Sequence, residues 1–251
     1  MIGKFLRSRR SLAPGSAIPA GQRVYAIGDV HGCLAELDRL LAQIDADDAA
    51  RGPADTTLVF LGDLVDRGPD SARVVERVVQ LTSDRADVHC LLGNHEEVFI
   101  GALSGDEKAL RLFCRIGGHE TALSYGMTAL AYERADYGEL AEALQRLVPA
   151  AHRSFLAGCE DMVAIGDYLF VHAGVAPDLP LDRQRPEDLR WIRARFLDHD
   201  RPLERTIVHG HTIAPEVEIR PHRIGIDTGA YQSGVLTALA LEGQERWVLQ
   251  S

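Results

Sequence analysis

One arrangement occurs three times in the first half of this chain. A short run rich in β-branched and aromatic residues leads into a glycine-bounded polar turn, and apolar residues at helical spacing follow. The three apolar runs are Val24–Ile27, Thr57–Leu61 and Val88–Leu92. A strand–turn–helix unit that repeats in this way predicts parallel strands joined by helical crossovers, and therefore an α/β fold. In such sheets the turns after the strands meet along one edge, where ligands collect.

The second half of the chain has a different pattern. Helical spacing dominates between the third run and residue 158, with breaks at Gly117-Gly118 and at Gly126, and predicts a helical insertion around 104–158. Helical spacing returns over Pro186–Leu197. Strands are expected at Tyr168–Val171, Thr206–Val208, Ile224–Ile226 and Val235–Leu241. Since no helices separate the last strands, we expect them to continue the sheets in antiparallel fashion.

The start of the chain differs from the rest. Proline and glycine interrupt any regular pattern up to Gly21, so we expect a flexible leader over residues 1–20 and a single domain over 21–251. The leader is basic but lacks a continuous apolar segment, which disfavours a secretory signal.

Charge and composition exclude several classes of function. The net charge of −10 argues against sequence-independent nucleic-acid binding, which depends on Lys and Arg. No apolar run approaches the length of a membrane span, so no membrane partner is expected. The four cysteines form no CxxC pair, and we expect reduced thiols in a cytoplasmic protein.

The polar turns carry carboxylate, imidazole and amide groups. Asp29 and His31 are two residues apart, so their side chains lie on the same side of an extended chain and could bind one ion together. Counterparts at the other strand ends are Asp63, Asn94, His172 and His211. Oxygen and nitrogen ligands without thiolates suit Mn, Fe or Zn, and two ions fit if one carboxylate bridges them. A pair of metals is the arrangement used for phosphoester hydrolysis.

These turns resemble the motifs of a known family. The sequence reads GDVHG at 28, GDLVDRG at 62, GNHE at 93, VHAG at 171 and HGHT at 209. The set and its order are similar to those of the metal-dependent phosphoprotein phosphatases within the calcineurin-like metallophosphoesterases. The resemblance implies a four-layer α/β/β/α sandwich with mixed sheets and two metal ions at its edge.

The resemblance also implies how the ligands are shared. Asp29 and His31 would bind the first metal, Asp63 would bridge, and the second metal would be bound by Asn94, His172 and His211. Manganese is the expected metal, with iron or zinc as alternatives, because the same ligands accept all three. His209 is not a ligand in the motif of this family.

Catalytic and substrate-binding roles follow from the same motifs. His95 would protonate the leaving oxygen, Asp66 would orient His95, and Arg67 would hold phosphate oxygens together with Asn94. Tyr231, in a segment that resembles the closing IDTG motif of bacterial members, would contact the substrate.

A second phosphate-binding arginine is expected between VHAG and HGHT. Trp191-Ile192-Arg193 resembles the W-x-R stretch of the family, so Arg193 is the expected residue, with Arg195 and Arg190 as alternatives.

The leading hypothesis is a protein phosphatase that acts on phosphoserine and phosphothreonine, with phosphotyrosine as a further candidate, by direct attack of a dimetal-bound hydroxide. The alternative is a hydrolase like the symmetrical diadenosine tetraphosphatases, whose motifs resemble GDLVARG and GNHD; Asp66 and Glu96 differ from these. A third hypothesis, a metal-binding scaffold without turnover, predicts the loss of a ligand or of the acid, and none is missing. The sequence leaves the oligomeric state open.

Overall fold

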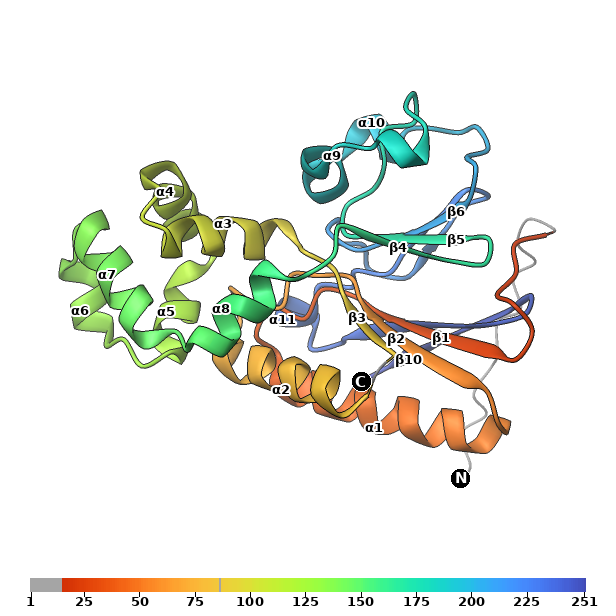
Figure 1. Ribbon diagram of the computed structural model, residues 1–251, viewed down its shortest axis with the longest axis horizontal. Coiled ribbons are helices and arrows are strands. Elements are labelled where there is room, and N and C mark those ends of the chain that lie inside the picture. Colours follow the sequence, from red (N-terminus) through yellow and green to blue (C-terminus); the bar gives the residue numbers. More distant parts are fainter. Residues whose placement is uncertain (1–14, 86) are drawn as a thin grey trace.

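The computed structural model describes residues 15–85 and 87–251 as two packed β-sheets covered on both outer faces by helices (Figure 1). Most of the expected leader, residues 1–14, lies outside the described residues. Its last part packs on the domain, because the Ile18 N–H donates to the Gly243 carbonyl at 2.8 Å and the Ile18 side chain is 2% exposed. The ordered domain therefore includes residues before 21.

The first sheet contains the three runs that opened the sequence. Its strand order is β10-β9-β1-β2-β3. The bounds are β1 Gln22–Ile27, β2 Asp55–Phe60, β3 Val88–Cys90, β9 Thr237–Glu242 and β10 Glu245–Gln250. As predicted, β1, β2 and β3 are parallel, and β9 and β10 continue the sheet in antiparallel fashion.

The second sheet has the order β4-β5-β6-β8-β7. The bounds are β4 Met162–Ile165, β5 Tyr168–Val171, β6 Thr206–His209, β7 Glu218–Ile219 and β8 Arg223–Gly225. The expectation that all late strands are antiparallel is wrong for β6 and β8, which are parallel although no helix connects them. The connection returns through the short strand β7, which pairs with β8 instead. Two parallel strands must be joined by a connection of about a dozen residues or more, but this connection need not be a helix. Residues 210–222 are long enough to form it.

Alternation along the strands separates the layers. In β1, Val24 and Ala26 face the second sheet and join the core between the sheets, whereas Tyr25 and Ile27 face the helices. Helices α1 (Leu34–Arg51) and α2 (Ser71–Asp84) cover that outer face. This is the predicted four-layer α/β/β/α arrangement with mixed sheets.

The outer face of the second sheet has its own helical cover. Leu169 and Ile207 pack against Leu189 and Phe196. Leu189 lies in α9 (Pro186–Trp191) and Phe196 in α10 (Ala194–Leu197). Both helices follow a 3-10 turn over Leu181–Arg183. The helix expected over 186–197 is thus interrupted at residues 192–193.

A group of helices projects from one end of the sandwich (Figure 1). The bounds are α3 Asn94–Leu103, α4 Glu107–Ile116, α5 Gly118–Ser124, α6 Ala129–Arg134, α7 Tyr137–Leu147 and α8 Ala150–Ala157. Gly117 ends α4 with a φ of 117°, a left-handed value that glycine adopts without strain. Of the four cysteines, only Cys114 is exposed.

None of the helices in 15–85 and 87–251 has both the length and the apolar composition of a membrane span.

Candidate metal centre

The turns after the strands adopt an unusual backbone conformation. Among the described residues, the non-glycine residues with positive φ are His31, Asp63, Asp66, Arg67 and His211, at 45° to 71°. All five are residues that the sequence predicted for the site. A left-handed conformation costs about 1–3 kcal/mol at a non-glycine residue and persists where surrounding contacts impose it. The strain is therefore concentrated in the turns that carry the predicted site residues.

Glu96 supplies much of this restraint. Its buried carboxylate accepts hydrogen bonds from the backbone N–H groups of Asp63 (2.7 Å), Leu64 (2.8 Å), Val65 (3.1 Å) and Gly93 (3.1 Å). Burial raises the pKa of Glu96 to about 7, but the four donors leave no place for a carboxylic proton, so the carboxylate is the form that fits. Glu96 thus joins the turn after β2 to the turn before α3.

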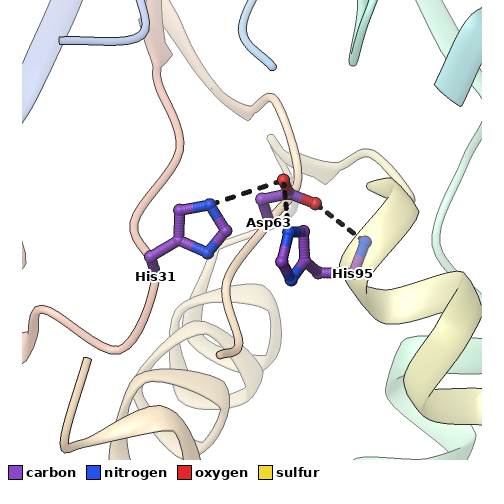
Figure 2. A group of neighbouring side chains, drawn as sticks. All are labelled: His31, Asp63 and His95. Atoms are coloured by element: carbon purple, nitrogen blue, oxygen red, sulfur yellow. Dashed lines mark hydrogen bonds and ion pairs between the residues drawn. The ribbon is translucent and has the colours of Figure 1, made fainter. Parts of the chain in front are cut away.

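Two groups with converging metal-binding atoms occur within residues 15–85 and 87–251, and His31, Asp63 and His95 form the first. Figure 2 shows the imidazoles of His31 and His95 directed at the carboxylate of Asp63. The Nε2 atoms of His31 and His95 lie 3.5 Å and 3.9 Å from Asp63 Oδ2. The backbone N–H of His95 donates to Asp63 Oδ1 at 3.0 Å, which orients the carboxylate between them.

Asp63 belongs also to the second group, with His172 and His211. The Nε2 atom of His172 lies 3.4 Å from Asp63 Oδ1 and 3.0 Å from the Asn94 amide oxygen. Its Nδ1–H donates to the Leu61 carbonyl at 2.8 Å, so Nε2, which faces Asp63 and Asn94, is the ring atom left to bind a metal ion. A carboxylate shared by two histidine groups is what a bridged pair of metal ions requires.

The protonation of the histidines agrees with this reading. Burial lowers the pKa of His31 to about 3 and that of His211 to about 2, and burial also lowers the pKa of His172. Neutral imidazole is the form that binds metal ions. The Nε2 atom of His211 is buried and has no hydrogen-bond partner within 15–85 and 87–251. A bound cation would satisfy this orphan atom, so the residues present fit a dinuclear site.

Asp29 lies outside both groups. Its carboxylate accepts the His211 N–H, at 3.0 Å and 3.2 Å from its two oxygens, and burial followed by the charge of Asp227 raises its pKa well above the usual value. Asp227, which was not among the predicted site residues, is 3% exposed, and burial raises its pKa to about 6. The sequence does contain a signal for Asp227. Ile224-Gly225-Ile226 is an apolar run that is followed by a carboxylate, as are the runs before Asp29 and Asp63.

His95 and Asp66 form a buried pair. The Nδ1 atom of His95 lies 2.7 Å from Asp66 Oδ2. Burial lowers the pKa of His95, but the charge of Asp63 and the hydrogen bond to Asp66 outweigh burial, and the net pKa is raised. An imidazole that keeps its proton to higher pH is suited to act as a general acid.

Arg67 and Tyr231 line the same site. Arg67 Nη2 lies 3.2 Å from His95 Nε2, and its guanidinium stacks 4.7 Å from the centre of the Tyr231 ring. Tyr231, in α11 (Ala230–Ser233), also contacts His31 edge to face at 5.4 Å between ring centres. The predicted substrate residues Arg67 and Tyr231 are thus brought together beside the first group.

The three candidate arginines of the W-x-R region differ in their surroundings. Arg190 binds Asp161 and Glu97, and Arg195 binds Asp178 and Asp188. Arg193 is exposed, and its charge contributes to the low pKa values of His172 and His211.

His209 faces away from the site. It is bound to the Gly210 carbonyl at 3.0 Å and packs edge to face against Phe196.

Comparison with known proteins identifies the type of fold and site. Residues 22–233 match the family model described as calcineurin-like phosphoesterase. A cold-active protein tyrosine phosphatase superposes with a TM-score of 0.62 and 20% identity, over 95% of this chain and 81% of that one. At that identity the likeness concerns the fold alone.

Relatives by sequence carry names of nucleotide hydrolases. The asymmetrical bis(5'-nucleosyl)-tetraphosphatase PrpE of Bacillus thuringiensis (strain Al Hakam) is 27% identical over 85% of this chain and 88% of its own length. The symmetrical bis(5'-nucleosyl)-tetraphosphatase of Methylococcus capsulatus (strain ATCC 33009 / NCIMB 11132 / Bath) is 36% identical over 61% of this chain and 44% of its own. These names belong to the class of the alternative hypothesis, the hydrolases of dinucleoside polyphosphates.

Proposed function

This chain belongs to the calcineurin-like phosphoesterase family, and from that premise we propose that it is a phosphomonoesterase that removes phosphate from phosphoserine and phosphothreonine of proteins, with phosphotyrosine as a further substrate. The observation that carries the proposal is the buried pair of His95 and Asp66, 2.7 Å apart, with the pKa of His95 raised.

The need for an acid depends on the leaving group. A phosphoserine or phosphothreonine ester releases an alkoxide, a strong base that departs readily only when it receives a proton. A dinucleoside polyphosphate releases a nucleoside phosphate anion, a much weaker base that departs without one. A chain that buries a carboxylate to hold an imidazole in its acid form is therefore better matched to an alcohol leaving group.

Metal ions would complete the site. We assign Asp29, His31 and Asp63 to one ion and Asp63, Asn94, His172 and His211 to the other, with manganese expected and iron or zinc as alternatives. When bound, such a pair supplies an activated water nucleophile at neutral pH and neutralises the charge of the phosphoryl group.

The protein's own side chains do the remaining work. Arg67 lies beside the first group of ligands and Arg193 near the second, and both bind phosphate oxygens. The side-chain amide of Asn94 binds phosphate as well. Asp66 keeps the Nδ1 side of His95 occupied, so Nε2 is the atom that transfers a proton to the leaving oxygen. Tyr231 forms a wall beside His31 against which the organic part of the substrate rests.

A hydrolase of dinucleoside polyphosphates is the second candidate. The names of the relatives from Bacillus thuringiensis and Methylococcus capsulatus support it. Tyr231 also suits it, because an aromatic ring beside cationic Arg67 can stack on a nucleobase while the arginine binds phosphate.

A substrate panel separates the two candidates. The manganese-loaded enzyme is offered a phosphoserine peptide and diadenosine tetraphosphate at equal concentration, as wild type and as His95→Asn. We expect faster release from the peptide, and a loss of about 10²–10⁴-fold in kcat for His95→Asn on the peptide.

Three results would count against the proposal. A strong preference for the dinucleotide favours the second candidate. A His95→Asn variant within a few-fold of wild type on the peptide contradicts the acid role. No release with any divalent metal at any pH points to a metal-binding scaffold.

A further inference from the structure

Helix α5 of the helical insertion contacts the turn that carries Asp66 and Arg67. The N–H of Asp66 donates to the Thr121 hydroxyl at 2.8 Å and to the Ser71 hydroxyl at 3.0 Å, and the N–H of Arg67 donates to the Gly117 carbonyl at 3.1 Å. Asp66 and Arg67 have φ values of 71° and 70°, so both need contacts that impose this conformation. Since Thr121 and Gly117 lie in or directly before α5, the insertion holds the turn in place together with Ser71 of α2.

Thr121 also binds the side chain of Asp66. Its hydroxyl donates to Asp66 Oδ1 at 2.6 Å, while Asp66 Oδ2 faces His95 Nδ1 at 2.7 Å. Thr121 and Asp66 are both fully buried, at 0% exposure. Each carboxylate oxygen therefore has one partner, and the carboxylate cannot turn without breaking the contact to Thr121 or the contact to His95.

This arrangement affects His95 through Asp66. A hydroxyl that donates to a carboxylate stabilises its ionised form and fixes its plane. The fixed oxygen in turn keeps the imidazole of His95 in one orientation, with Nε2 on the side of Arg67, 3.2 Å from Nη2. An imidazole held in this way transfers its proton along one direction.

We propose that Thr121 is a positioning residue for proton transfer from His95 to the leaving group, acting through Asp66. The inference rests on the proposed phosphomonoesterase function. Thr121 does not touch the substrate, so its effect on the rate depends on how much the leaving group needs a proton. A purely structural residue would slow all substrates alike.

The same helix offers a matched control. The Ser124 hydroxyl accepts the Ala72 N–H at 3.0 Å and donates to the Thr121 carbonyl at 2.7 Å. It ties α5 to α2, as does Thr121, whose hydroxyl lies 3.1 Å from Ser71 Oγ, but it does not contact Asp66. Ser124→Ala therefore reports the cost of loosening α5 alone.

The test compares two aryl phosphates that differ in leaving-group basicity. The manganese-loaded wild type, Thr121→Val, Thr121→Ser and Ser124→Ala are assayed for kcat with 4-nitrophenyl phosphate and with phenyl phosphate, and their thermal unfolding is recorded. Thr121→Val keeps the shape and removes the hydroxyl, whereas Thr121→Ser restores it.

We expect Thr121→Val to lose about tenfold in kcat on phenyl phosphate and less than about twofold on 4-nitrophenyl phosphate, since loss of a general acid entirely costs about 10²–10⁴-fold. Thr121→Ser should be within about twofold of wild type on both substrates. Ser124→Ala should show the same ratio between the substrates as wild type, even if its melting temperature falls as far as that of Thr121→Val.

Two results overturn the inference. If wild type is active and Thr121→Val slows both substrates by the same factor, Thr121 is structural and the proposed function stands. If wild type hydrolyses neither aryl phosphate, the proposed function fails and the inference falls with it.

Discussion

Replacing Glu96 by Gln tests the claim that one buried carboxylate holds two turns of the metal centre. The two oxygens of Glu96 each accept two backbone N–H groups, Oε2 from Asp63 and Gly93 and Oε1 from Leu64 and Val65. An amide puts an NH2 group in place of one oxygen, so two buried donors lose their acceptor. At about 1–3 kcal/mol for each unsatisfied buried donor, the free energy of unfolding should fall by about 2–6 kcal/mol.

The measurement is urea unfolding with a chelator present, so that metal binding does not contribute to the stability. Glu107→Gln is the control, because Glu107 is 64% exposed and pairs with Arg111 on the surface. Its loss should stay within about 1 kcal/mol. Glu96→Asp, one methylene shorter, should also be destabilised, since its carboxylate cannot reach all four donors.

Activity provides the second readout. Because Glu96 fixes the backbone of Asp63, both variants at position 96 should require more manganese for half-maximal activity than wild type. A Glu96→Gln protein that unfolds within about 1 kcal/mol of wild type and has unchanged metal dependence would refute the assignment.

Further predictions concern the core, the metals and acid stability. Phe170→Ala in the core between the sheets, where Phe170 is fully buried, should cost about 3–5 kcal/mol by urea unfolding. A chelator should abolish phosphoesterase activity and added manganese should restore it; activity that persists after dialysis against the chelator contradicts a metal-dependent site. The hydrogen bond from Arg223 lowers the pKa of Glu218 from 4.5 to about 2, so its ionised form stabilises the fold above pH 4.5 and this contribution is lost as the pH falls toward 2. Because Glu218 is 34% exposed, the stability difference between wild type and Glu218→Gln should be at most about 1 kcal/mol at pH 6, and it should shrink between pH 4.5 and 2.

The strands and their polar turns were predictable because the signals are local. An apolar run that stops at Gly28 or Gly62 and continues with an aspartate specifies a strand and the group at its end. The parallel order of β1, β2 and β3 follows from the helices between them. The parallel pairing of β6 with β8 could not be predicted from the sequence in this way, because it depends on which strand pairs with the short β7.

The surroundings of individual side chains could be predicted less well from the sequence. Asp29 was predicted as a ligand by its motif, but its closeness to Asp227 depends on packing between two distant turns. Among the three arginines of the W-x-R region, the ion pairs of Arg190 and Arg195 distinguish them from Arg193, and those pairs join residues from different elements.

The sequence by itself determined which chemical groups lie at the strand ends, because the spacing of apolar residues and the turn-forming residues are both local features of the sequence. Only the tertiary structure decided how those groups are restrained. The hydroxyl of Thr121 reaches Asp66 across 55 positions of the chain, and the carboxylate of Glu96 reaches Asp63 across 33. Contacts of that separation depend on how the helices dock on the sheets, which no local pattern encodes.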